Sequence, residues 1–142
     1  MVVRRLEHYN IRTTRYAETV KFYDEALAMK ARRAPMAAAG SPATWIYDDS
    51  GAAAIHLTPV DPADPVGSYA RISRYRGADP AAAFEGSGAI DHIAFECDGY
   101  DEIRARLQAL ELAFAENALP DFNLRQIFVK DPNGVTLELN FR

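Results

Sequence analysis

The sequence predicts an α+β fold of two tandem βαβββ modules that form a cupped mixed sheet with helices on its outer face. Two observations predict it. The order strand, helix, three strands occurs twice along the chain. In addition, three residue pairs share one constant sequence offset, as expected for an internal duplication; they are His8 and His92, Tyr16 and Tyr100, and Glu18 and Glu102.

Length and charge limit the possible functions. The 142 residues suffice for one domain or for two small halves that share a core, and 49% of them are hydrophobic. A net charge of -4 argues against nucleic acid and membrane surfaces as partners, because both bind through Lys and Arg. We expect a cytoplasmic protein, because the sequence has no signal pattern and no apolar run of spanning length. The single cysteine, Cys97, is predicted to be a buried, inert thiol.

The first module is predicted at residues 1–58. Its first segment alternates polar and apolar side chains as a strand does, and the helix after it carries an apolar stripe at Val20, Tyr23 and Leu27. Breaks that contain Gly and Pro separate three further short strands. The expected elements are a strand at 6–13, a helix at 16–29 and strands at 28–34, 44–47 and 53–58.

Residues 59–88 are rich in Pro, Ala, Gly and Asp and show no clear period, so we interpret them as a linker. A connection of this length is typical of a lid or an interface, and surface packing is the alternative. The second module is predicted at residues 89–142. Its elements are a strand at 89–97, a helix at 100–110 with Asp98 as its N-cap, a further element at 113–118 and a hairpin at 126–141.

The hairpin is the strongest local signal in the chain. Asp131, Pro132, Asn133 and Gly134 suit the four positions of a type I turn. Because side chains alternate along a strand, the apolar residues after the turn face the core and Glu138 faces the opposite side. A carboxylate in the middle of a strand requires a polar partner.

The three histidines and Glu138 occupy equivalent places. His8, His56, His92 and Glu138 each lie in the middle of the first or last strand of a module, with small or polar neighbours on their own face. A single strand histidine is more often structural, but four such residues in a duplicated pattern indicate a metal site. Imidazole and carboxylate ligands suit one divalent ion such as Fe, Mn, Zn, Ni or Co.

Four segments of the sequence carry a family resemblance: LEHYNIRT with His8, ETVKFYDEALAM, AIDHIAFEC with His92, and QIFVKDPNGVTLELNF with Glu138. They resemble the vicinal oxygen chelate superfamily, which includes glyoxalase I, methylmalonyl-CoA epimerase, fosfomycin- and bleomycin-resistance proteins, and extradiol dioxygenases. The resemblance covers nearly the whole chain. Its most specific part is DPNG followed by a strand glutamate.

The resemblance implies that His8, His92 and Glu138 bind the metal, with His56 as the fourth ligand. Two alternatives stay open: with His56 bound, two of six coordination positions remain for a substrate, and without it the other three form a facial triad. This chain also departs from its relatives. Glyoxalase I has glutamate and the epimerase glutamine where this chain has His56, and ring-cleaving dioxygenases have tyrosine where it has Phe128.

The implied function is that of a metal-dependent enzyme. It would chelate two neighbouring oxygens of a small metabolite for lyase, isomerase or dioxygenase chemistry, with Glu138 or His56 as the catalytic group that transfers a proton. The alternative is a protein that sequesters a small molecule without turnover, as antibiotic-resistance relatives do. Relatives of this size are often dimers, so we expect a homodimer.

Overall fold

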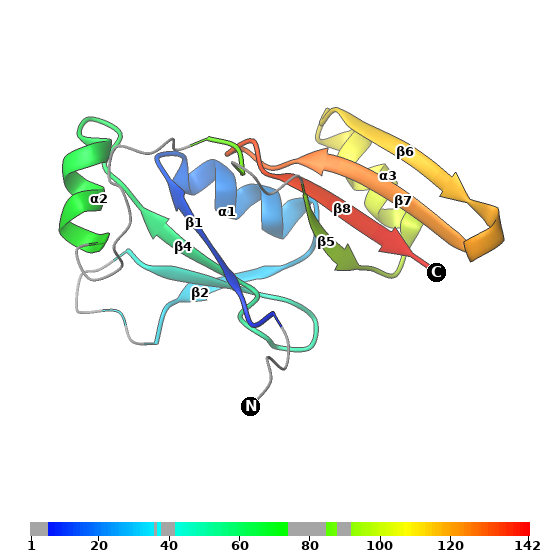
Figure 1. Ribbon diagram of the computed structural model, residues 1–142, viewed down its shortest axis with the longest axis horizontal. Coiled ribbons are helices and arrows are strands. Elements are labelled where there is room, and N and C mark those ends of the chain that lie inside the picture. Colours follow the sequence, from blue (N-terminus) through cyan, green and yellow to red (C-terminus); the bar gives the residue numbers. More distant parts are fainter. Residues whose placement is uncertain (1–5, 36, 38–41, 74–84, 88–91) are drawn as a thin grey trace. The chain divides into compact units, whose positions relative to one another are not determined.

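The computed structural model describes residues 6–35, 37, 42–73, 85–87 and 92–142 (Figure 1). The chain divides into two compact units. The first unit comprises residues 1–24 and 28–84, and the second comprises residues 25–27 and 85–142. No helix in the described part of the chain is long and apolar enough to span a membrane.

The first unit contains the predicted βαβββ order. Its four strands form one mixed sheet in the order β1-β4-β3-β2, in which β1 runs parallel to β4 and the other neighbours are antiparallel. The predicted boundaries of β3 are correct, and those of β1 and α1 extend beyond the observed ends. The elements are β1 (Tyr9–Thr13), α1 (Tyr16–Glu25), β2 (Lys30–Arg33), β3 (Thr44–Tyr47) and β4 (Ile55–Pro59).

Apolar side chains from alternate strand positions bury one face of this sheet. Ile46 and Ile55 are fully buried, and Phe22 and Tyr23 of α1 are buried as well. Each such side chain contributes about 1.5–3 kcal/mol when fully buried. The hydroxyl groups of Thr13 and Thr19 also meet, at 3.3 Å, and join β1 to α1. The remaining strand positions, which include His56, therefore lie on the opposite face.

Helix α2 (Pro65–Ser73) lies inside the predicted linker and was not expected. Asp64 begins it: its side-chain oxygen accepts a hydrogen bond from the backbone N–H of Gly67 at 3.0 Å, and Pro65 occupies the first helical position. Tyr69 is buried, and the guanidinium carbon of Arg12 lies 4.7 Å from the centre of its ring. The rest of the predicted linker lies largely outside the described residues.

The second unit repeats the same topology. Its sheet has the order β5-β8-β7-β6, with β5 parallel to β8, and Ile127, Leu137 and Leu139 are fully buried with Leu107 of the helix. The fold class is therefore confirmed: two four-stranded mixed sheets arise from two βαβββ modules. The elements are β5 (Ile93–Glu96), α3 (Tyr100–Ala109), β6 (Phe114–Leu119), the 3-10 helix η1 (Pro120–Phe122), β7 (Leu124–Lys130) and β8 (Thr136–Phe141).

The prediction of Asp98 as the N-cap of α3 is wrong. The N-cap is Gly99, which has left-handed backbone angles (φ 72°, ψ 55°) and forms no side-chain capping bond. A left-handed conformation suits glycine because it has no Cβ. This glycine therefore turns the chain into the helix, which begins at Tyr100 as predicted.

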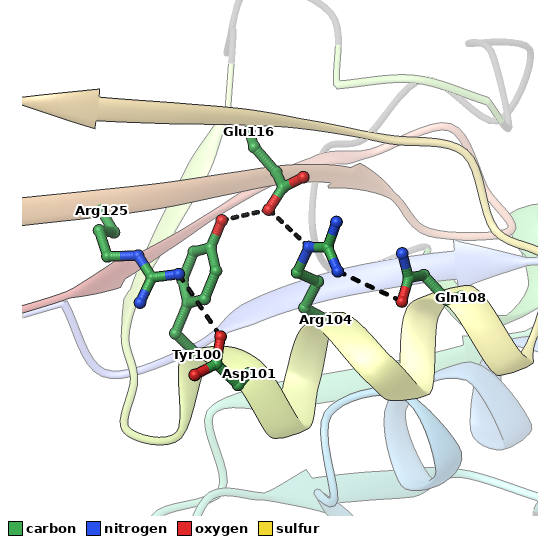
Figure 2. A network of polar contacts seen from close by, with 6 residues as sticks. All are labelled: Tyr100, Asp101, Arg104, Gln108, Glu116 and Arg125. Atoms are coloured by element: carbon green, nitrogen blue, oxygen red, sulfur yellow. Dashed lines mark hydrogen bonds and ion pairs between the residues drawn. The ribbon is translucent and has the colours of Figure 1, made fainter.

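A polar network joins α3 to the sheet (Figure 2). Glu116 of β6 accepts hydrogen bonds from the Tyr100 hydroxyl and from Arg104 Nε, the latter at 2.9 Å. The bond to Glu116 raises the pKa of Tyr100, and the Tyr100 and Arg104 donors lower the pKa of Glu116. The guanidinium group of Arg125 lies over the Tyr100 ring, and its Nη2 atom is 3.5 Å from Asp101 Oδ1. Because these groups are exposed or only half-buried, the network orients α3 more than it stabilises the fold.

The predicted turn between β7 and β8 is present. Gly134 N donates to Asp131 O at 3.0 Å, and one oxygen of the buried Asp131 carboxylate accepts from the N–H groups of Asn133 and Val135, both at 2.9 Å. Gly134 has φ +78°, and a Cβ there would lie 3.2 Å from Gly86 N. Gly86 N in turn donates to Asn133 O at 2.7 Å. Hydrogen bonds to the Asp131 side chain within the turn and one hydrogen bond from Gly86 outside it thus stabilise the turn.

Gly134→Ala is expected to destabilise the protein more than Gly51→Ala. Both glycines have positive φ, which costs alanine about 1–2 kcal/mol, but the added Cβ meets nothing within 4 Å at Gly51. Urea denaturation of the two variants measures the difference. Equal losses of unfolding free energy would contradict the role of the Gly86 contact.

Candidate functional site

The side chains opposite α3 in the second unit meet across three strands. The strand register pairs Glu138 of β8 with Ala94 of β5 and with Phe128 of β7. It also pairs Asn140 with Gln126. His92, just before β5, approaches the same carboxylate.

His92 and Glu138 form a direct contact. His92 Nε2 lies 3.0 Å from Glu138 Oε2, and the two side chains are 38% and 13% exposed. The Phe128 ring lies nearly perpendicular to the imidazole of His92, with the ring centres 6.3 Å apart. Nitrogen and oxygen ligands lie about 2.0–2.2 Å from zinc, so two adjacent ligands of one ion lie about 3 Å apart. The spacing of this pair therefore fits a metal ion as well as a hydrogen bond.

Amide side chains hold the other carboxylate oxygen. Glu138 Oε1 accepts hydrogen bonds from Asn140 Nδ2 at 2.8 Å and from Gln126 Nε2 at 3.0 Å. Gln126 Nε2 also donates to Asn140 Oδ1 at 3.0 Å, and Gln126 Oε1 accepts from Asn117 Nδ2 at 2.9 Å. Glu138 thus has amide donors on one oxygen and an imidazole on the other.

In the first unit, three aromatic rings stack across β4 and β3. His56 lies between His8 and Trp45: its ring centre is 3.7 Å from that of His8 and 4.3 Å from that of Trp45. The planes differ by only 17° and 5°. Trp45 also contacts Tyr47, over whose ring Arg32 places its guanidinium carbon at 5.3 Å. Trp45 is therefore a packing partner of His56.

The four predicted ligands thus form two pairs, one in each unit. His8 stacks on His56, and His92 contacts Glu138. In the part of the chain that the structure describes, His, Cys, Asp and Glu side chains form no group of three or more that could hold a metal ion. The predicted four-ligand site stays a prediction.

The amides around Glu138 are the residues that the sequence analysis missed. The alternation along the last strand places Asn140 on the same face as Glu138, as observed, but it carries no information on Gln126 or Asn117. The hairpin could have identified Gln126. Counting outward from the turn pairs Phe128 with Glu138 and Gln126 with Asn140, as observed.

The fold and these side chains define a protein built from a duplicated βαβββ module with a histidine–carboxylate pair on the open face of the second sheet. The sequence profile of the Glyoxalase/Bleomycin resistance protein/Dioxygenase superfamily matches residues 5–139. The chain belongs to this superfamily. Comparison with curated protein sequences gives no significant match.

Solved structures share the fold at low sequence identity. A virulence protein from Salmonella typhimurium has a TM-score of 0.65 at 14% identity, with 99% of this chain and 98% of that chain covered. An antibiotic binding protein from Streptomyces sp. CB03234 has a TM-score of 0.62 at 17% identity (99% and 98%). Lactoylglutathione lyase from Agrobacterium tumefaciens has a TM-score of 0.57 at 16% identity (94% and 91%). The fold thus occurs both in a lyase and in an antibiotic binding protein.

Cys97 takes no part in the His92–Glu138 pair. It lines a cavity of about 460 Å³ in the second unit, with Tyr100, Arg125, Phe141 and other residues. Burial raises the pKa of its thiol to about 11, so the thiol stays protonated at neutral pH. Cys97 was predicted to be buried, whereas the residue is half-buried. The raised pKa is consistent with the predicted inertness, because the thiolate is the reactive form.

Ellman's reagent is expected to react with Cys97 about 100-fold more slowly in the folded protein than in urea at pH 8, because the raised pKa lowers the thiolate fraction by that factor. Equal labelling rates in the folded and unfolded states would contradict the raised pKa of this thiol.

The raised pKa of Cys97 also predicts how stability depends on pH. The unfolded chain loses the thiol proton first, so the free energy of unfolding falls between pH 9.0 and about 11. Cys97→Ser should lack this part of the fall.

Proposed function

We propose that this protein is a divalent-metal-dependent enzyme that chelates two neighbouring oxygens of a small metabolite for lyase, isomerase or dioxygenase chemistry. The contact of 3.0 Å between His92 Nε2 and Glu138 Oε2 carries the proposal. It pairs the two ligand types that suit borderline divalent ions, at the spacing of adjacent ligands. A purely structural pair would not require the small and polar neighbours on this face.

His8 supplies the third ligand in this proposal. The internal repeat supports it, because His8 holds in the first module the place that His92 holds in the second. His92, Glu138 and His8 would then form a facial triad suited to Fe(II), Mn(II) or a related ion. Zn, Ni and Co remain candidates, because the ligand types alone do not select the metal.

We assign His56 the role of proton carrier. The nitrogen lone pairs of an imidazole lie in the plane of its ring, and the planes of His8 and His56 are nearly parallel at 3.7 Å. An ion bound by an imidazole lies in the plane of its ring, and no point close to both rings lies in both planes. The two imidazoles as stacked therefore cannot both bind one ion. This geometry favours the alternative in which three residues bind the metal and His56 stays outside.

The chemistry then divides among the side chains. A bound divalent ion would act as a Lewis acid toward the chelated substrate oxygens. Glu138 and His92 orient the ion on the second sheet, and His56 accepts or returns the substrate proton. Trp45 keeps the His56 ring in one orientation by stacking on it.

Sequestration without turnover is the second candidate function. The similarity of fold to an antibiotic binding protein favours it, as does the aromatic surface around Trp45 and Tyr47. In this case a small molecule would bind equally well after chelator treatment. We propose a homodimer for either function, with no nucleic-acid or membrane partner.

Metal analysis tests the proposal. Purified protein is expected to hold one divalent ion per chain. His92→Ala or Glu138→Ala should weaken metal binding by roughly 100-fold or more, because each removes a proposed direct ligand. Loss of a contact that only supports a ligand already costs up to about 100-fold. His56→Phe preserves the stack and should retain the metal. The proposal fails if the wild type binds no divalent ion, or if the His92 and Glu138 variants bind it unchanged. Loss of metal in His56→Phe would instead restore His56 as a fourth ligand.

A further inference from the structure

We propose that Gln126 is a positioning residue that restricts Glu138 to metal binding through one oxygen, Oε2. This inference rests on the function proposed above. It concerns a residue that donates to the other carboxylate oxygen of Glu138, Oε1, and it follows from the hydrogen-bond capacity of the atoms involved.

The amide of Gln126 has only one satisfactory orientation. Its two N–H bonds serve two acceptors, Glu138 Oε1 and Asn140 Oδ1, both at 3.0 Å. Its carbonyl oxygen accepts from Asn117 Nδ2 at 2.9 Å. A flipped amide would set oxygen against two acceptors and nitrogen against a donor. The network therefore fixes which end of Gln126 faces the carboxylate.

The Oε1 atom of Glu138 is fully used by these contacts. A carboxylate oxygen has about two lone-pair sites, and Oε1 accepts from both Gln126 Nε2 and Asn140 Nδ2. No lone pair remains on this oxygen for a metal ion. Oε2 is directed instead toward His92 Nε2. The carboxylate consequently presents one ligand atom rather than two.

Gln126 dominates this arrangement because of its place in the sheet. It is only 8% exposed, it lies on β7 opposite Asn140, and it takes part in three of the four amide contacts. Asn140 is half-buried and supplies one donor to Oε1. Removing Gln126 releases Oε1 from its partner strand, whereas removing Asn140 leaves the Gln126 bond in place.

The restriction affects how many positions a substrate can occupy. Binding by both oxygens of Glu138 would occupy one more coordination position of a divalent ion than binding by Oε2 alone. A substrate that chelates through two neighbouring oxygens itself needs two positions. By keeping Oε1 engaged, Gln126 would leave that additional position free for substrate or water.

Cobalt titration of the purified chain tests the inference. Gln126→Met keeps the size of the side chain but removes both donors and the acceptor. We expect Co²⁺ affinity to fall about 10- to 100-fold, the usual effect of losing a contact that orients a metal ligand. The visible absorption spectrum of bound cobalt should also change, because a second carboxylate oxygen alters the coordination number. Thr136→Val, on the same strand and face as Glu138, is the matched control and should change neither quantity.

The outcomes separate the inference from the proposed function. Wild-type affinity and an unchanged cobalt spectrum in Gln126→Met would overturn the role of Gln126 while leaving the metal site intact. Absence of cobalt binding by the wild type would overturn the proposed function and this inference with it. If Gln126→Met fails to fold by circular dichroism, Asn140→Ala, which removes one donor, should show a smaller loss of affinity and a smaller spectral change; no change there would also overturn the inference.

Discussion

The buried carboxylate of Asp131 fixes the geometry on which the second unit depends. Its Oδ1 accepts two backbone N–H groups, and its Oδ2 accepts from Asn133 Nδ2 at 3.1 Å. These bonds offset the cost of burying a charge, and they close the turn at a single register. A slip of one residue would exchange the two faces of β8 and send Glu138 into the core. The contact between His92 and Glu138 therefore depends on Asp131, a turn residue that is not part of the pair.

Strand parity explains why much of the fold could be predicted from the sequence. Alternation placed His56 and Glu138 on the face opposite the apolar residues, and the observed burial agrees. Helix α2 could not be predicted in the same way. It is short, it contains Gly67, and the Asp64 cap and the burial of Tyr69 support it more than any periodicity does. The order of the strands in each sheet likewise follows from packing and not from spacing.

The candidate site was predicted as single residues, and the structure adds their neighbours. A sequence shows that His56 and Glu138 are candidates, but cross-strand register determines that Trp45 stacks on the first and that Gln126 binds the second. Register depends on the turn and on both strands together. This explains why the candidate residues can be predicted from the sequence alone, whereas the groups that contact them appear only once the strands are paired.

The role of His56 then depends on a comparison of energies. A stacked aromatic pair contributes about 0.5–1.5 kcal/mol beyond its buried area, whereas a structural zinc site contributes about 10–16 kcal/mol over its full ligand set. In the proposed metal site, the stack on Trp45 would therefore bias His56 away from the ion without preventing ligation. An ion that gains little from a fourth nitrogen would leave His56 stacked and available for the proposed proton transfer. An ion that demands four protein ligands would draw the ring from Trp45 and remove the proposed proton carrier, so the identity of the ion would also decide the chemistry open to the proposed site.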